Sequence, residues 1–369
     1  MLTFFGIVFL VYGGMHLYAF AKVWQAFPHT TTLGAALVFA GLLLSISPLF
    51  IFYAARQHWH NAVVSVSWPI YVWMGYIFLF FAIGMVLDAG HLLTVLLGLR
   101  WPMSAMHMLL VISLSAFVCA SYGLYDARQI RIEHITIATP KLKNGSVTIA
   151  QVSDMHLGAM LGGEFLGRVI GKLNEIKPDI IVATGDIVDG QGDHLNGLAQ
   201  RLRTCTAPMG KFAVLGNHEY YVGMDESLRF LDNAGFAVLR GEAVETGGIV
   251  IAGVDDPAGS GLGRQARLDA DTAIRNLGKD DFVVLLKHQP VVDMNNRFDL
   301  QLSGHIHGGQ IFPFNYLTKM TYKVETGLAR LEGGRWLYVS RGTGTWGPPM
   351  RLLAPPEVTL ITLTSASSN

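Results

Sequence analysis

Charged residues are nearly absent from the first third of the chain. The sequence balances 27 basic against 27 acidic residues, but only four of these precede position 126: Lys22, Arg56, Asp88 and Arg100. Roughly 20 apolar residues span a bilayer, and four uncharged stretches reach that length: 1–21, 23–55, 57–87 and 101–125. A charge at the bilayer centre costs roughly 2.5 to 3.5 kcal/mol, so we expect the four charges in loops or at helix ends. The pattern predicts a transmembrane region of four helices over residues 1–126 and a soluble domain over 127–369.

The basic residues around these stretches indicate the orientation of the chain. An even number of spans places both ends on one side of the membrane, and the cytoplasmic side usually carries more lysine and arginine. Lys22 and Arg100 fall on one side, and the other side carries a larger group: Arg56, Arg128, Arg131, Lys141 and Lys143. We therefore predict a multi-pass protein of the cell membrane with a cytoplasmic soluble domain. The first stretch lacks the basic start of a signal peptide, so we expect a retained helix.

Short apolar runs in the soluble part end, one after another, in polar clusters. Each run has the length of a buried strand: 147–152, 180–183, 212–215, 282–286, 300–302 and 336–339. Helix-like apolar spacing at 165–176 and 227–234 separates some of the early runs. Strands therefore alternate with helices early and follow one another later, which predicts an α/β sandwich.

The predicted strands end in residue types that bind metal ions. Ligands collect at strand ends in α/β sheets, and five blocks occur there: Asp154-Met155-His156, Gly185-Asp186, Gly216-Asn217-His218-Glu219, Lys287-His288 and Gly304-His305-Ile306-His307. Carboxylate, amide and imidazole ligands suit hard or borderline ions, and the absence of cysteine argues against a structural zinc site. We expect divalent ions, with manganese first and iron or zinc as alternatives.

In this order the five blocks resemble the calcineurin-like metallophosphoesterase superfamily, whose pattern is Asp-x-His, Gly-Asp, Gly-Asn-His-Asp/Glu, a lone His and Gly-His-x-His. The strings Ser-Asp-Met-His-Leu-Gly and Ser-Gly-His-Ile-His-Gly-Gly-Gln resemble its bacterial membrane-associated branch of YkuE- and YaeI-like phosphodiesterases. The resemblance covers roughly residues 130–363 and leaves out the apolar stretches. It implies an α/β/β/α sandwich, here preceded by an all-α membrane part.

Carried over to this sequence, the resemblance implies a site for two metal ions. One ion would be held by Asp154, His156 and His307, the other by Asn217, His288 and His305, and Asp186 would bridge them. Two ions roughly 3.5 to 4 Å apart can clamp a phosphoryl group and provide a bridging hydroxide for in-line attack. His218 would stay unligated and protonate the leaving oxygen or stabilise charge. Glu219 would orient His218, although the family more often has aspartate there.

Several residues near the blocks have two interpretations. Asp189 could support the site from behind the ligands or cap a helix, and Arg341 and Arg351 could grip a phosphate or belong to ordinary turns. One group of aromatic residues could form an apolar mouth for a lipid, cover a nucleobase or pack in the core: Tyr220, Tyr221, Phe312, Phe314, Tyr316 and Trp346. The run 311–322, with Lys319 and Lys323, could meet the membrane surface, but we favour core or pocket packing.

The sequence therefore predicts a metal-dependent phosphoesterase. The leading hypothesis is hydrolysis of a phosphodiester or pyrophosphate bond in a membrane-derived substrate, either a lipid or a nucleotide-linked lipid. One alternative is a general phosphodiesterase or phosphoprotein phosphatase that is merely anchored. Another is a membrane sensor with a regulatory phosphoesterase-like domain, although the scarcity of intramembrane charge argues against an ion path. We expect a phosphorylated substrate and the membrane as partners, and no nucleic acid.

Overall fold

The chain divides into two compact units in the computed structural model. One unit comprises Met1–Tyr125 and Gly347–Leu352, and the other comprises Asp126–Trp346 and Leu353–Asn369. The structure describes residues 2–142, 145–190, 195, 197–262, 277–278, 280–292 and 297–366. Lys143, which was counted among the basic residues on the predicted cytoplasmic side, lies outside the described residues.

The first unit is helical. Its four helices are α1 (Leu2–Ala26), α2 (Thr31–Arg56), α3 (His60–Leu96) and α4 (Ala105–Asp126). Among the described residues, α2, α3 and α4 are long and apolar enough to cross a membrane. The prediction of four spanning helices is therefore supported for three, because α1 is not among them. These three helices identify the chain as membrane-associated.

Two of the early charges lie inside helices, where the sequence had predicted loops or helix ends. Lys22 in α1 and Asp88 in α3 form an ion pair with 2.6 Å between Nζ and Oδ1. The Tyr18 hydroxyl donates to the other Asp88 oxygen at 2.6 Å. Pairing lowers the cost of placing either charge in an apolar setting, so neither needs to lie at a helix end. Arg56 in the last turn of α2 and Arg100 beyond α3 agree with the prediction.

The second unit contains two six-stranded mixed sheets. The first sheet has the order β1 (Arg131–Thr139), β12 (Glu357–Ser365), β2 (Ser146–Val152), β3 (Ile180–Thr184), β4 (Lys211–Val214) and β5 (Ala237–Val238). The second has the order β10 (Gly327–Arg330), β11 (Trp336–Val339), β9 (Leu300–Ser303), β8 (Val283–Leu286), β7 (Ile249–Gly253) and β6 (Glu242–Thr246). All six apolar runs predicted as buried strands are strands, which confirms the α/β class.

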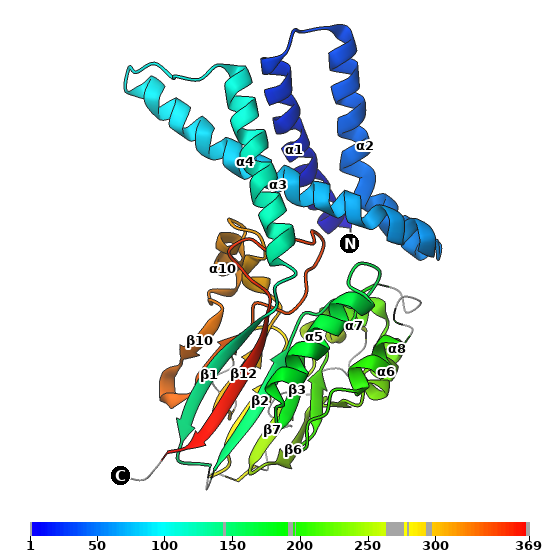
Figure 1. The fold of residues 1–369 in the computed structure, drawn as a ribbon, viewed down its shortest axis with the longest axis vertical. Helices are drawn as coiled ribbons and strands as arrows, with labels where there is room; N and C mark the ends of the chain where they lie inside the picture. Colours follow the sequence, from blue (N-terminus) through cyan, green and yellow to red (C-terminus); the bar gives the residue numbers. More distant parts are fainter. Residues whose placement is uncertain are drawn as a thin grey trace. The chain divides into compact units, whose positions relative to one another are not determined.

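Apolar side chains join the layers of this unit. Between the sheets, Ile149 from β2 belongs to the same buried cluster as Val284 from β8. On the other face of the first sheet, Leu166 from α5 packs with Ile181 from β3. Figure 1 shows α5 and α6 in green over this face. The helical segments of the unit are α5 (Gly163–Ile176), α6 (Leu198–Arg203), α7 (Asn217–Val222), α8 (Met224–Asn233) and α10 (Asn315–Tyr322), with short 3-10 turns η2 (Pro257–Leu262), η3 (His307–Gly309) and η4 (Glu332–Gly334).

Candidate metal centre

Five strands bring the predicted site residues together. A ligand-type side chain follows the last residue of each strand by two or three positions: Asp154 after β2, Asp186 after β3, Asn217 after β4, His288 after β8 and His305 after β9. β2, β3 and β4 are parallel to one another, and so are β8 and β9. Their carboxyl ends therefore share one edge in each sheet, which is where ligands bind in such folds.

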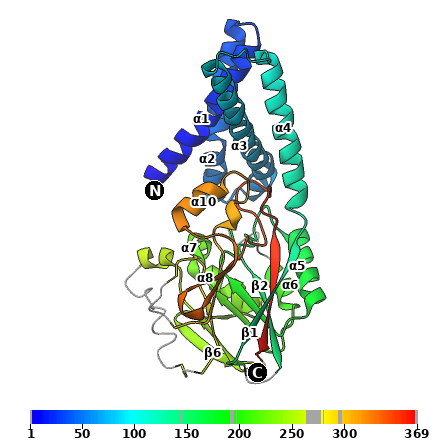
Figure 2. The same ribbon diagram turned by 90° about the vertical axis from the view of Figure 1, so that its left-hand side faces the viewer.

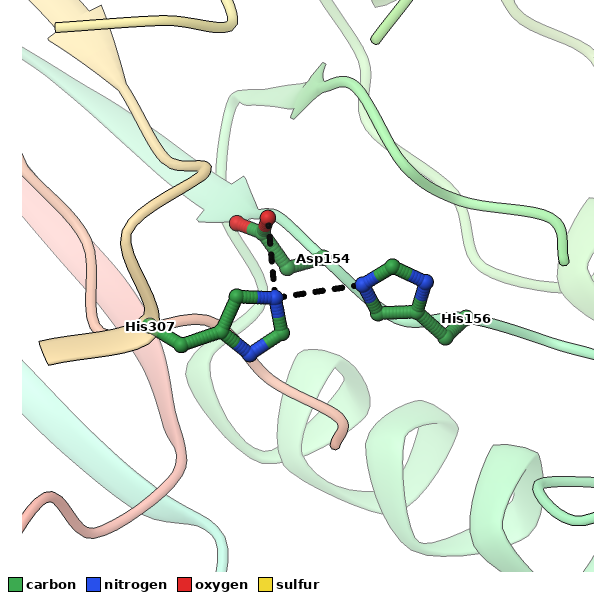
Figure 3. Close-up of side chains that lie close together, drawn as sticks. All are labelled: Asp154, His156 and His307. Atoms are coloured by element: carbon green, nitrogen blue, oxygen red, sulfur yellow. Dashed lines mark hydrogen bonds and ion pairs between the residues drawn. The ribbon is translucent and has the colours of Figure 1, made fainter. Parts of the chain in front are cut away.

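The first group of converging side chains consists of Asp154, His156 and His307. His307 Nε2 lies 3.3 Å from Asp154 Oδ1 and 3.1 Å from His156 Nε2. Figure 3 shows the His307 ring contacting both partners through this one nitrogen. One ligand atom from each residue thus points to a common centre, as a metal site requires.

The second group is centred on His288. Its Nε2 lies 3.1 Å from Asp186 Oδ2, 3.1 Å from His305 Nδ1 and 3.2 Å from Asn217 Oδ1. Asp186 Oδ2 also lies 4.0 Å from His156 Nε2, which belongs to the first group. The same carboxylate oxygen therefore faces both groups, and this position supports a bridging role for Asp186.

The protonation pattern of His288 fits a cation at this place. Its Nδ1 lies 2.8 Å from the Thr184 carbonyl oxygen, which can only accept, so Nδ1 carries the proton of the neutral ring. Nε2 then presents a lone pair to the oxygens of Asp186 and Asn217, which accept as well. A divalent ion among these atoms would satisfy all of them, and the backbone contact fixes the ring orientation that it needs.

The pKa values of the histidines in the second group also indicate a site for a cation. Burial lowers the pKa of His288, but the carboxylates of Asp186 and Asp154 outweigh burial and raise it to about 10. Burial and the neighbouring His288 charge together lower the pKa of His305 to about 4. The surroundings thus favour a positive charge at this position, and a bound cation would supply it in place of a proton.

His218 contacts the carboxylate of Asp189. Its Nδ1 lies 3.0 Å from Asp189 Oδ1. Burial lowers the pKa of His218, but Asp189 outweighs burial and raises it to about 9. The second oxygen of Asp189 lies 3.7 Å from His156 Nδ1. Of the two interpretations of Asp189, the geometry favours support of the site.

Glu219 does not orient His218, contrary to the sequence prediction. Its fully buried carboxylate accepts backbone N–H bonds from Asp186 at 2.9 Å, Ile187 at 2.7 Å and Gly216 at 2.7 Å. These amides lie in turns that leave them without strand partners, and a buried unpaired amide is costly. Glu219 therefore joins the loop after β3 to the start of α7, and Asp189 takes the position beside His218.

Five of the predicted ligand residues adopt a left-handed backbone. The φ angles are 53° for Asp154, 48° for His156, 52° for Asp186, 73° for His305 and 51° for His307. Non-glycine residues rarely occupy this region, at a cost of about 1 to 3 kcal/mol each, and such strain clusters at functional sites. These left-handed conformations could not be predicted from the sequence, because the glycines of the motifs indicate only where the chain turns.

The aromatic residues near the blocks divide into two kinds. Tyr221 and Trp346 flank His218, with ring centroids 5.3 Å and 5.6 Å from the imidazole, and they are 71% and 52% exposed. Tyr220 is buried in the core. Two of the aromatic side chains considered for an apolar mouth therefore lie beside His218.

Within the run 311–322 only Ile311 is buried, so the favoured interpretation of core or pocket packing is wrong for most of that run.

Neither arginine considered for phosphate contact is placed for it. The Arg341 guanidinium pairs with Glu133 at 2.8 Å and also with Glu357. Arg351 is fully buried and belongs to the helical unit, where its main-chain N–H donates to the Gly123 carbonyl at 2.9 Å. The ion pairs of Arg341 and the burial of Arg351 leave neither guanidinium exposed to a phosphate.

One contact to a predicted metal ligand, His305, was not predicted from the sequence. The Tyr322 hydroxyl, at the end of α10, lies 2.5 Å from His305 Nε2. Partners of this kind orient metal-binding imidazoles. A tyrosine 17 positions after the histidine, outside any motif, carries no signal that could have predicted the contact.

The fold and the side chains at its strand ends define a class of metal-dependent phosphoesterases. Residues 147–309 match the calcineurin-like phosphoesterase family. The chain is 45% identical over 253 residues to a metallophosphoesterase of Aquifex aeolicus, and the alignment covers 67% of this chain and 97% of that protein. The chain belongs to the calcineurin-like metallophosphoesterase family.

Two further relatives carry the same domain, and one of them is named as a transmembrane protein. Identity to the metallophosphoesterase YkuE of Bacillus subtilis is 37% over 235 residues, covering 59% of this chain and 79% of that protein. Identity to a "transmembrane protein with metallophosphoesterase domain" of Danio rerio is 32% over 268 residues, covering 68% and 61%. The resemblance inferred from the sequence motifs is confirmed.

Proposed function

We propose that this protein is a dinuclear metal-dependent hydrolase of phosphodiester or pyrophosphate bonds in membrane-derived substrates. The observation that carries the proposal is the pair of side-chain groups that share Asp186, with His288 presenting a lone pair to oxygens that also only accept. A divalent ion could take the place of the proton that the raised pKa lets His288 hold, and the oxygen and nitrogen donors of the two groups suit two such ions.

Seven side chains would hold the ions: Asp154, His156 and His307 on one side, Asn217, His288 and His305 on the other, and Asp186 between them. Bound divalent ions would neutralise phosphate charge and make a water nucleophilic near neutral pH. The oxygen and nitrogen donors favour manganese, with iron or zinc as alternatives.

His218 would act as the proton donor. Asp189 raises its pKa to about 9, so the ring is protonated at neutral pH and can give a proton to the leaving oxygen. The contact through Nδ1 leaves Nε2 free to face the substrate. Asp189 is then a positioning residue and Glu219 a structural one.

The membrane setting supports the substrate class. The chain carries helices able to cross a bilayer, and relatives include transmembrane proteins with this domain. The exposed rings of Tyr221 and Trp346 beside His218 would cover an apolar or planar part of the leaving group. We propose a multi-pass cell-membrane protein with its catalytic domain in the cytoplasm, as the arginine and lysine distribution favours.

A substrate panel tests the proposal. Purified full-length protein with manganese would be assayed on bis-p-nitrophenyl phosphate, a phospholipid and a nucleotide-linked lipid in mixed micelles. We expect hydrolysis of the soluble diester and of at least one lipid. Cleavage of the soluble diester alone would indicate a general phosphodiesterase and would contradict the hypothesis of a lipid substrate. No cleavage by protein with both ions bound would contradict the hydrolase itself.

A further inference from the structure

Helix α10 turns its apolar side chains outward. Tyr316, Leu317 and Met320 are 60%, 55% and 76% exposed, whereas Asn315 and Tyr322 on the opposite side are partly buried. A helix packed on a protein core normally has the reverse arrangement. α5 follows that rule and buries Phe165, Leu166, Val169 and Leu173, but α10 has no buried residue.

The segment just before α10 extends the same apolar area. Phe312 and Phe314 are also exposed, and the Phe312 ring meets the Tyr316 ring edge to face at 5.8 Å. We refer to these five side chains as the α10 surface: Phe312, Phe314, Tyr316, Leu317 and Met320. Five large apolar side chains exposed within nine residues form a contiguous patch, and such patches mark interaction sites.

The α10 surface is anchored at the metal centre. At the end of α10, the Tyr322 hydroxyl contacts His305 Nε2. Before α10, the Gln310 side chain accepts from the Trp346 N–H at 2.9 Å and donates to the Trp346 carbonyl at 2.9 Å. Both views of the unit draw α10 in orange beyond the ends of the strands (Figure 1 and Figure 2). Whatever binds this surface is therefore held close to the catalytic side chains.

The chemistry of the surface fits lipid. Aromatic rings, leucine and methionine point outward, and two exposed lysines lie beside them: Lys319, which pairs with Glu325, and Lys323. Aromatic residues and lysines together favour the headgroup region of a bilayer. Three helices of the same chain are long and apolar enough to cross a membrane, so a bilayer is the lipid surface that this chain would meet. We propose that the α10 surface inserts into the lipid–water interface of the membrane, beside the metal centre.

This insertion does not depend on a lipid being the substrate. It would bring the metal centre to the depth of lipid phosphates, and so it agrees with the proposed function without resting on it. A soluble protein partner on the same patch is the competing occupant, and the experiment below separates the two.

Fluorescence quenching by lipid measures insertion directly. Met320→Cys and, as a matched control, Glu245→Cys would each be labelled with an environment-sensitive fluorophore in full-length protein carrying Cys119→Ser and Cys205→Ala. Glu245 is exposed on β6, away from α10. In phosphatidylcholine and phosphatidylglycerol nanodiscs containing shallow doxyl lipids, we expect quenching of the label at 320 by about twofold or more and none at 245. Equal quenching of both labels by aqueous iodide, with no doxyl effect, would overturn the proposal.

A second measurement uses the unsubstituted protein, in which no label or cysteine substitution can alter the α10 surface. Nanodiscs containing a photoactivatable phosphatidylcholine would be irradiated and the lipid adducts mapped on peptides. Adducts on residues 312–320 as well as on α2, α3 and α4 are expected. Adducts confined to the helices of the first unit would contradict insertion. Hydrolysis of bis-p-nitrophenyl phosphate, measured in parallel, reports separately on the metal centre.

Discussion

His288 shows most clearly what single residues contribute to this site. One ring nitrogen donates a hydrogen bond to the Thr184 carbonyl, and the other faces the oxygens of Asp186 and Asn217 as well as the His305 imidazole. A hydrogen bond from the His305 ring could reach Nε2, but it would leave the two facing oxygens without a donor. A cation is the simplest completion of such a set.

Substitution of Asp186 should reduce metal binding and hydrolysis more than substitution of any other single residue of the site. We expect Asp186→Asn to reduce bound metal and to lower metal-dependent hydrolysis of bis-p-nitrophenyl phosphate by about 100-fold or more, because one oxygen faces both groups. Metal analysis and steady-state kinetics on the same preparation check this. Unchanged metal content would contradict the bridging assignment.

His218 should separate catalysis from metal binding. His218→Ala removes the proton donor but none of the seven proposed ligands. The expected result is full metal content with a rate lower by roughly 100- to 10,000-fold, the range for general acid catalysis. Loss of metal together with rate would show that His218 is a ligand instead.

The Asp189 carboxylate should set the alkaline limit of activity. His218 must be protonated to donate, so the rate is retained below its pKa of about 9 and lost as pH rises through that value. Asp189→Asn removes the charge that raises this pKa, and the alkaline limb of the kcat profile should move to lower pH. A limb that stays in place would exclude His218 as the titrating group.

At the scale of elements, the loop after β3 and the start of α7 depend on Glu219. Its carboxylate accepts several backbone N–H bonds while fully buried, and Glu219→Gln would aim an amide NH2 at some of these donors. We expect a loss of about 1.5 to 3 kcal/mol in the free energy of unfolding, the range for hydrogen bonds to a charged group. Urea unfolding of the purified protein measures it, with the exposed Glu245→Gln in β6 as the control that should change little.

The sequence predicted strands and ligand types well and side-chain directions poorly. Runs such as 180–183 were recognisable because a strand buried on both faces is continuously apolar. Asp189 rather than Glu219 lies beside His218, because a carboxylate turns to whichever donors the tertiary fold places nearby. The expectation of core or pocket packing for the run 311–322 was wrong for most of its residues, because apolar composition alone does not say which side of a segment faces the protein.

For the whole molecule, the structure unites a membrane-associated helical unit with a metallophosphoesterase unit in one chain. The helical unit also includes Gly347–Leu352, a segment that no sequence pattern assigned to it. The chain continues from Trp346, beside His218, directly into this segment. The chain thus passes between the two units at three places in the sequence, after Tyr125, after Trp346 and after Leu352.

The most direct test of the central claim is metal removal and return in the full-length protein. Chelation should abolish hydrolysis of bis-p-nitrophenyl phosphate, and manganese should restore it with saturation at about two equivalents per chain, as a two-metal site requires. Full activity in metal-free protein, or restoration without measurable metal binding, would contradict the account.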